Sequence, residues 1–202
     1  MRLEPFALDL DPPLETASAR IDRREGFLVT VEHAGQEGFG EATPLPGWTE
    51  SRQECRDALE RAAAVADELD WGIALARMEA PAARHGLALA LADARAKADG
   101  RPLYRTLGAE QTVRRVPVNA TIGDGEPAAT ATAAMSAVEA GFDCVKVKVG
   151  GRAVDADRRR LEAVRRAIGE EVLLRADANG AWDRGQAETA LDWMGAVGVE
   201  YV

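Results

Sequence analysis

The second half of the chain repeats a strand followed by a helix, and this repeat constrains the fold more than any other feature. Three short apolar stretches have the composition of buried strands: residues 116–122, 144–149 and 172–177. Asn119, Lys148 and Asp177 occupy equivalent places in these stretches, 29 residues apart in each step. Strand–helix units of this kind form parallel strands joined by right-handed crossovers. We therefore predict a parallel α/β sheet in this half.

Helical patterns fill the intervals between these strands. They cover about 127–140 and 155–168, each stopped by a glycine, and a third starts near residue 183. A closed (β/α)₈ barrel needs about 250 residues. The 90 residues from 113 to 202 have room for three such units, and we expect the sequence to stop inside the next strand. We expect either a piece of a longer enzyme or an open half-structure, and we favour the piece.

The first half of the chain has an α+β pattern instead. Residues 27–33 and 39–42 alternate between apolar and polar around a glycine-containing turn, which predicts a hairpin. Ser51 can cap a helix that reaches about Leu69. Pro81 suits the first turn of a second helix that ends near Asp99. We predict a domain boundary between residues 112 and 113, with an α+β domain at 1–112 and an incomplete (β/α) barrel at 113–202.

Two of the three lysines in the chain lie two residues apart, in the second predicted strand. Alternate residues of a strand share a face, so Lys146 and Lys148 point one way and the flanking valines the other. Each ammonium group disfavours the charge of its neighbour, and partial burial acts in the same direction, so at least one lysine pKa should fall. Such a lysine can remove a proton next to a carboxylate. The alternative is two surface lysines on a solvated edge strand.

A second polar face follows on the third predicted strand, where Arg175, Asp177 and Asn179 alternate with apolar residues. Asp177 and Asn179 come at the carboxyl end of the strand, where barrel enzymes have their catalytic residues. Hard oxygen ligands there suit Mg²⁺. The alternative is an Asx-turn that ends the strand. A metal-binding carboxylate and a lysine base that face the same cavity are the groups needed to form an enediolate from a carboxylate substrate.

Composition excludes several other classes of function. The net charge of −9 disfavours binding to nucleic acid. The sequence contains no apolar run long enough to span a membrane and no secretory leader pattern, so we predict a cytoplasmic protein without a membrane partner. Two cysteines are too few for a disulfide framework. His33 and His85 are isolated and are interpreted as structural or surface residues.

The pattern Lys146-Val147-Lys148, followed by Asp177-Ala178-Asn179, resembles the enolase superfamily, specifically its muconate-lactonizing-enzyme-like branch. Three further segments, at 38–47, 93–108 and 116–122, are similar to the o-succinylbenzoate synthases, which are dehydratases of menaquinone biosynthesis. The resemblance covers essentially the whole chain. It implies an N-terminal α+β capping domain followed by the first units of a (β/α) barrel, and a magnesium-dependent carbon–oxygen lyase acting on a small carboxylate.

The resemblance also implies roles for single residues. Lys148 would be the base that takes the α-proton and then, as an acid, assists loss of water. Lys146 would position the carboxylate and lower the pKa of Lys148. Asp177 would be the first of three ligands to Mg²⁺, for which Mn²⁺ could substitute. The supporting residues would be Asn179, Arg175 and Asn119, and the capping loops that close over the substrate would contribute Thr16, Arg20, Pro46, Trp48 and Thr49.

Three functional hypotheses remain open at this point. The first is o-succinylbenzoate synthesis by a protein of which this chain is the first part, since the resemblance puts a second metal ligand just after a segment like residues 200–202. The second is racemisation of an N-acylamino acid or epimerisation of a dipeptide at the same site, because proton abstraction is common to all these reactions. The third is an inactive remnant, or a subunit that needs a partner chain. Assembly into an oligomer is compatible with each of them.

Overall fold

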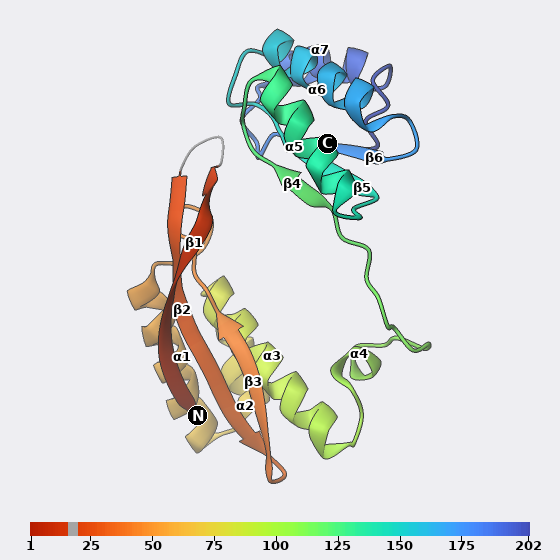
Figure 1. Cartoon of the computed structure of the whole chain (residues 1–202). Coiled ribbons are helices and arrows are strands. Elements are labelled where there is room, and N and C mark those ends of the chain that lie inside the picture. Colours follow the sequence, from red (N-terminus) through yellow and green to blue (C-terminus); the bar gives the residue numbers. More distant parts are fainter. Residues whose placement is uncertain (16–19) are drawn as a thin grey trace. The chain divides into compact units, whose positions relative to one another are not determined.

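The computed structural model describes residues 1–15 and 20–202 (Figure 1). The chain divides into two compact units, one formed by Met1–Leu10 and Arg23–Arg115 and the other by Asp11–Asp22 and Val116–Val202. The division into a capping domain at 1–112 and a barrel domain at 113–202 stays a prediction, because compactness alone does not show which residues cap a site. None of the helices in the described part of the chain has the length and apolar character needed to cross a bilayer.

The first unit contains most of a three-stranded sheet in the order β1-β2-β3, of which the ends of β1 and β2 within Asp11–Asp22 are counted with the second unit. Its strands are β1 (Arg2–Glu15), β2 (Arg20–His33) and β3 (Gln36–Ala42). β2 and β3 pair antiparallel, with a register that runs from Phe27↔Ala42 to His33↔Gln36. The turn between them uses positive φ angles at Ala34 and Gly35. The hairpin predicted over 27–42 is therefore confirmed, whereas the edge strand β1 was missed.

Helices cover this sheet and supply most of its core. They are α1 (Arg52–Glu68), α2 (Trp71–Ala76) and α3 (Pro81–Ala98). The short α4 (Leu103–Thr106) follows α3 and has no buried residue. Ser51 caps α1 in a full capping box, because its hydroxyl accepts from the Glu54 N–H while the Glu54 carboxylate accepts from the Ser51 N–H. Pro81 opens α3 as expected from its fixed φ. Both predicted helices are confirmed.

Small residues bring α3 very close to β3. Gly38 and Gly40 of β3 face the helix, and a Cβ built on Gly40 would lie 2.0 Å from the carbonyl oxygen of Gly86. On β2, the alternate residues Phe27 and Val29 are buried in the same core. Gly38 and Gly40 therefore serve helix–sheet packing, whereas Gly35 serves the turn.

The second unit is built from parallel strands that neighbour one another in chain order, β4-β5-β6. The strands are β4 (Ala120–Ile122), β5 (Cys144–Lys148) and β6 (Leu173–Asp177), and the helices are α5 (Pro127–Glu139), α6 (Val154–Ile168) and α7 (Arg184–Met194). After α7 the chain returns beside β6, where Val199 forms a parallel bridge with Leu174. Sequential parallel order is the arrangement of barrel strands, so the predicted fold class is confirmed.

The first predicted strand of this unit is shorter than expected. Residues 116–119 are outside β4, and Val116 and Val118 are 71% and 66% exposed. Only the three residues of β4 have partners on β5, from Ala120↔Val145 to Ile122↔Val147. The prediction of a strand over 116–122 was therefore wrong for its first half, because Pro117 has no N–H to donate and no neighbouring strand extends that far.

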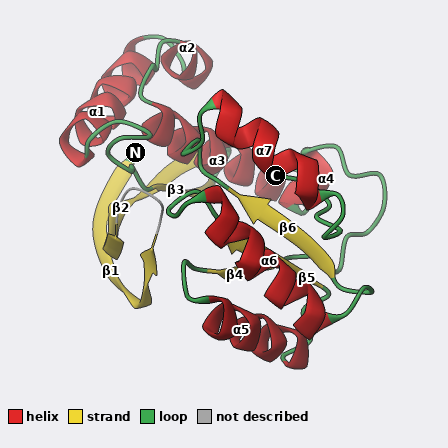
Figure 2. Ribbon diagram, turned by 90° about the horizontal axis from the view of Figure 1, so that it is seen from above, coloured by secondary structure: helices red, strands yellow, loops and turns green. Residues whose placement is uncertain are grey.

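The pleat of the sheet separates a core face from a polar face. Val145, Val147, Leu174 and Ala176 are buried on one face, together with residues of α5, α6 and α7. Figure 2 shows these three helices beside β4, β5 and β6. The opposite face carries the polar side chains predicted from the alternation. These are Lys146, Lys148, Arg175 and Asp177, and all four are only partly buried. The sheet thus presents its polar side chains away from the three helices.

Candidate active site

Lys148 is the most closely held residue of the polar face. It is the last residue of β5 and lies opposite Asp177, the last residue of β6, in the parallel register. Its Nζ donates to Asp177 Oδ2 at 2.7 Å and to Asn179 Oδ1 at 2.6 Å. The side chain of Lys148 is 14% exposed. The ammonium group is therefore fixed in place by two oxygens of the neighbouring strand end.

Lys146 shares the same carboxylate. Its Nζ donates to Asp177 Oδ2 at 2.9 Å, so both ammonium groups contact one oxygen atom. The two lysines therefore lie on one face, as the alternation predicted. The expectation from the sequence, that each ammonium group and partial burial disfavour the charge of the lysines, did not include this shared carboxylate.

Asp177 is held in its ionised form. Partial burial raises the pKa of its carboxyl group, but hydrogen bonds from Lys148, Lys146 and the backbone N–H of Asn179 lower the pKa to about 2. The Asn179 N–H donates to Asp177 Oδ1 at 3.0 Å, and Asn179 has a positive φ of 48°. This is the Asx-turn geometry that was the alternative interpretation. Here the turn also brings the Asn179 side chain to Lys148.

Two of the predicted supporting residues lie apart from this hydrogen-bonded group. Arg175 is opposite Lys146 in register, but its Nε donates to Glu200 Oε2 at 2.6 Å and its guanidinium lies over the ring of Tyr201, 4.7 Å from the centroid. Asn119 precedes β4, and its Nδ2 makes only long contacts to Ala120 O and Thr121 Oγ1, at 3.5 and 3.4 Å. Their roles at the site stay predictions.

The predicted capping-loop residues belong to other parts of the chain. Thr16 lies outside the described residues, and Arg20 is on β2, where its Nε donates to Asp22 Oδ1. Thr49 closes a tight turn, because its hydroxyl accepts from the Leu45 N–H at 2.8 Å. In the same turn Pro46 bridges to Thr49 and Trp48 is 65% exposed. Contact of these loops with substrate stays a prediction.

The oxygens of this site fit part of a magnesium site. Asp177 supplies an ionised carboxylate and Asn179 an amide oxygen, which are the hard donors that Mg²⁺ prefers. Within residues 1–15 and 20–202, however, no three His, Cys, Asp or Glu side chains converge as a ligand group. The described residues therefore provide one carboxylate ligand, and the remaining ligands of a complete site would have to come from elsewhere.

Comparison with protein families shows which superfamily the chain belongs to. The model of the enolase C-terminal domain-like family matches residues 129–202, and the model of the MenC N-terminal domain matches residues 2–94. The chain belongs to the enolase superfamily. This assignment agrees with the resemblance found in the lysine pair and the Asp-Ala-Asn motif.

Individual relatives within the superfamily carry out two different reactions. An o-succinylbenzoate synthase of Thermosynechococcus vestitus is 32% identical over 96% of this chain and 56% of its own length. A hydrophobic dipeptide epimerase of Roseobacter litoralis is 30% identical over 94% of this chain and 57% of its own. The structure of a dipeptide epimerase from Enterococcus faecalis, in complex with Mg and L-Leu-L-Tyr, superimposes with a TM-score of 0.89 at 27% identity, covering 98% of this chain and 58% of that one. The chain spans a little over half the length of these relatives.

Sequence reasoning missed one ion pair beside the site. Glu200 neutralises Arg175, and its backbone N–H donates to Leu174 O at 2.8 Å, so it lies on the segment that returns beside β6. The signal was available, because the segment 199–202 follows α7 at the place where the next parallel strand begins. That Glu200 pairs with Arg175 depends on the register of residues 199–202 beside β6, which the spacing of residues in the sequence does not give.

Proposed function

We propose that the protein containing this chain removes the α-proton of a small carboxylate substrate, with Lys148 as the base. The observation that carries this proposal is the fixed position of the Lys148 amine on the polar face, between Asp177 and Asn179. A base held in a single geometry is close to the arrangement that proton transfer requires. Lys146, on the same face, supplies a second positive charge that would orient the substrate carboxylate.

The first candidate reaction is the o-succinylbenzoate synthase reaction of menaquinone biosynthesis, a dehydration of the carbon–oxygen lyase class. The match of the MenC N-terminal domain over residues 2–94 favours it. Lys148, with its amine in the neutral form, would take the α-proton of the cyclohexadiene carboxylate. The resulting ammonium group would return a proton to the hydroxyl group as the carbon–oxygen bond breaks, so that water leaves. When bound at Asp177, Mg²⁺ would neutralise charge that develops on the substrate carboxylate.

The second candidate reaction is epimerisation of a dipeptide or of an N-acylamino acid. It is favoured by the epimerase relatives, one of them 30% identical over 94% of this chain. Lys148 would remove the same type of proton, but a second acid on the other side of the carbon would return one with inverted configuration. The two candidates therefore share the base and differ in the fate of the carbanion.

One experiment separates these candidates and tests the base. The full-length protein is supplied with Mg²⁺ and assayed for loss of the cyclohexadiene carboxylate, and separately, in D₂O, for deuterium incorporation at the α-carbon of dipeptides and N-succinylamino acids. Lys148→Ala should lower the rate of whichever reaction occurs by about a hundredfold or more. Lys97→Ala is the matched control, because this third lysine pairs with Asp93 on α3, in the first unit. An unchanged rate in Lys148→Ala would contradict the proposed role.

A further inference from the structure

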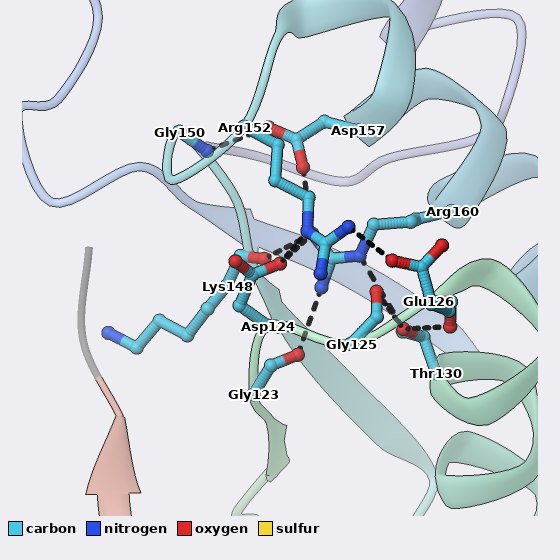
Figure 3. Close-up of polar contacts among 10 residues, drawn as sticks. All are labelled: Gly123, Asp124, Gly125, Glu126, Thr130, Lys148, Gly150, Arg152, Asp157 and Arg160. Atoms are coloured by element: carbon cyan, nitrogen blue, oxygen red, sulfur yellow. Dashed lines mark hydrogen bonds and ion pairs between the residues drawn. The ribbon is translucent and has the colours of Figure 1, made fainter. Parts of the chain in front are cut away.

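Among the side chains of the second unit whose burial the structure describes, the two most deeply buried charged groups lie on α6 and take part in no proposed reaction step. Asp157 and Arg160 are 0% and 1% exposed, and Arg160 Nη1 lies 2.7 Å from Asp157 Oδ1 (Figure 3). Burying both members of an ion pair removes them from water at a cost that their mutual attraction alone often fails to recover. The other hydrogen bonds of the pair must therefore help to offset the cost of burying it.

Those bonds hold the ends of two neighbouring strands. Arg160 Nη2 donates to Gly123 O at 2.9 Å, directly after β4, and Nη1 donates to Lys148 O at 2.9 Å, at the end of β5. Asp157 Oδ2 accepts from the Gly150 N–H at 2.7 Å, in the loop that follows β5. One planar guanidinium thus spans both strand ends with a fixed geometry, which a lysine could not reproduce.

A second arginine strengthens the same connection closer to solvent. Arg152, in the loop after β5, contacts Asp124 at 2.8 Å and Glu126 at 2.6 Å, in the loop after β4 (Figure 3). Asp124 is in turn 3.4 Å from Arg160 Nη1. The two loops at the carboxyl end of the sheet are therefore joined to each other by charged side chains, with the buried pair at the centre.

Lys148 is consequently held from two sides. Its carbonyl oxygen accepts from Arg160 on the helix side, and its ammonium group donates to Asp177 and Asn179 on the polar side. The carbonyl group and the Cβ of Lys148 are attached to the same Cα, so a change in the peptide orientation redirects the side chain. Misplacement of a reacting group by about 1 Å can lower a rate by about a hundredfold.

We infer that the Asp157–Arg160 pair is a positioning device for Lys148, which fixes the backbone of the base against the end of β4. This inference rests on the proposed function for its kinetic consequence. Its structural consequence, control of the segment around residues 145–152, is independent of any reaction.

The same helix contains a comparison residue for testing this inference. Arg165 also donates to several carbonyl groups, among them Val172 O at 2.8 Å and Gly198 O at 2.8 Å. Val172 immediately precedes β6, so Arg165 acts at the amino ends of strands, away from Lys148. If arginines on α6 only stabilised the fold, replacement of Arg160 and of Arg165 would affect turnover alike.

The test uses the full-length protein with Arg160→Lys and Arg165→Lys. Both variants keep the positive charge and lose the fork that spans several carbonyl groups. In Arg160→Lys we expect kcat to fall by about ten- to a hundredfold with KM nearly unchanged. In the same variant, amide hydrogen exchange over residues 145–152 should accelerate. In Arg165→Lys we expect kcat and the amide exchange over residues 145–152 to stay close to those of the unsubstituted protein, even if the melting temperature of the variant falls.

Two results would overturn the inference. One is unchanged exchange over 145–152 in a folded Arg160→Lys protein, and the other is an equal loss of kcat in both arginine variants. If Arg160→Lys does not fold, Asp157→Asn replaces it, because the amide still fits the site but loses the charge that holds the guanidinium, and it should change exchange and kcat in the same direction. If the unsubstituted protein turns over neither substrate class, the proposed function fails, and the exchange measurement still decides whether the pair controls this segment.

Discussion

Replacement of Gly40 by alanine should destabilise the first unit because α3 leaves no space for a side chain. A Cβ at Gly40 would lie 2.0 Å from Gly86 O and 2.8 Å from Ala90 N, both of them backbone atoms of α3. A carbon atom needs more than 3 Å to an oxygen, so the helix must move by about 1 Å across its contact with β3. Overpacking of a core costs about 1–3 kcal/mol, and we expect about 3 kcal/mol here, because helix backbone cannot rotate away as a side chain can.

Urea unfolding of the full-length protein, followed by circular dichroism, measures this loss as a change in the free energy of unfolding. Gly195→Ala is the matched control, since Gly195 has a φ of −61° at the end of α7 and an added Cβ would meet nothing within 4 Å. The control should change stability by less than about 0.5 kcal/mol. A loss of less than about 1 kcal/mol in Gly40→Ala would refute the close-packing explanation for these glycines.

Further predictions concern the two cores. Burial and the nearby carboxylate of Glu50 raise the pKa of the Cys55 thiol from 9.0 to about 12, so its stabilising contribution is complete below pH 9 and is lost as the pH rises toward 12. Unfolding titrations should show a loss of about 1.4 kcal/mol between pH 8 and pH 10 that is missing in Cys55→Ala. In the second unit, Leu174→Ala should cost about 3 kcal/mol in urea unfolding, because Leu174 is 0% exposed. Leu173→Ala, at the adjacent residue on the other face of β6, should cost less than about 1 kcal/mol, and equal losses would contradict the assignment of faces.

Local patterns predicted those elements whose partners are close in sequence. The hairpin over 27–42, the cap at Ser51 and the start of α3 at Pro81 each depend on residues within a few positions of one another. The alternation of lysine and valine in β5 also gave the correct faces, because the pleat has a period of two in any sheet. These features needed no knowledge of the tertiary structure.

Elements whose existence depends on distant partners were predicted less well. β1 contains Pro5, Pro12 and Pro13, which argue against a strand, yet its place at the edge of the sheet leaves N–H positions that need no partner. Residues 116–119 showed a good alternation but had no strand opposite them, so they stayed irregular. Alternation is therefore evidence for a strand only where a neighbouring strand can pair with it.

The candidate site shows the same limit. Spacing placed Lys146, Lys148 and Asp177 on polar faces, but only the register Lys148↔Asp177 shows that both ammonium groups share one carboxylate. The buried Asp157–Arg160 pair was missed, although both residues fall on the helix face of Leu161 and Val164, where charged residues are unexpected. Charges at apolar positions of an amphipathic pattern were the available signal.

The core and the candidate site of the second unit are specified by one and the same register. A shift of β5 by one residue would move Lys146 and Lys148 into the core and bring Val145 and Val147 to the polar face, because every side chain of a strand changes face together. Burial of the two valines therefore also determines the direction in which the lysines point. Packing of the valines fixes the face on which Lys148 lies, but it does not fix the orientation of the Lys148 peptide. The hydrogen bond from Arg160 to the Lys148 carbonyl oxygen supplies that constraint. For this reason we expect core substitutions such as Leu174→Ala to lower stability with little effect on kcat, and Arg160→Lys to lower kcat by more than its effect on stability explains.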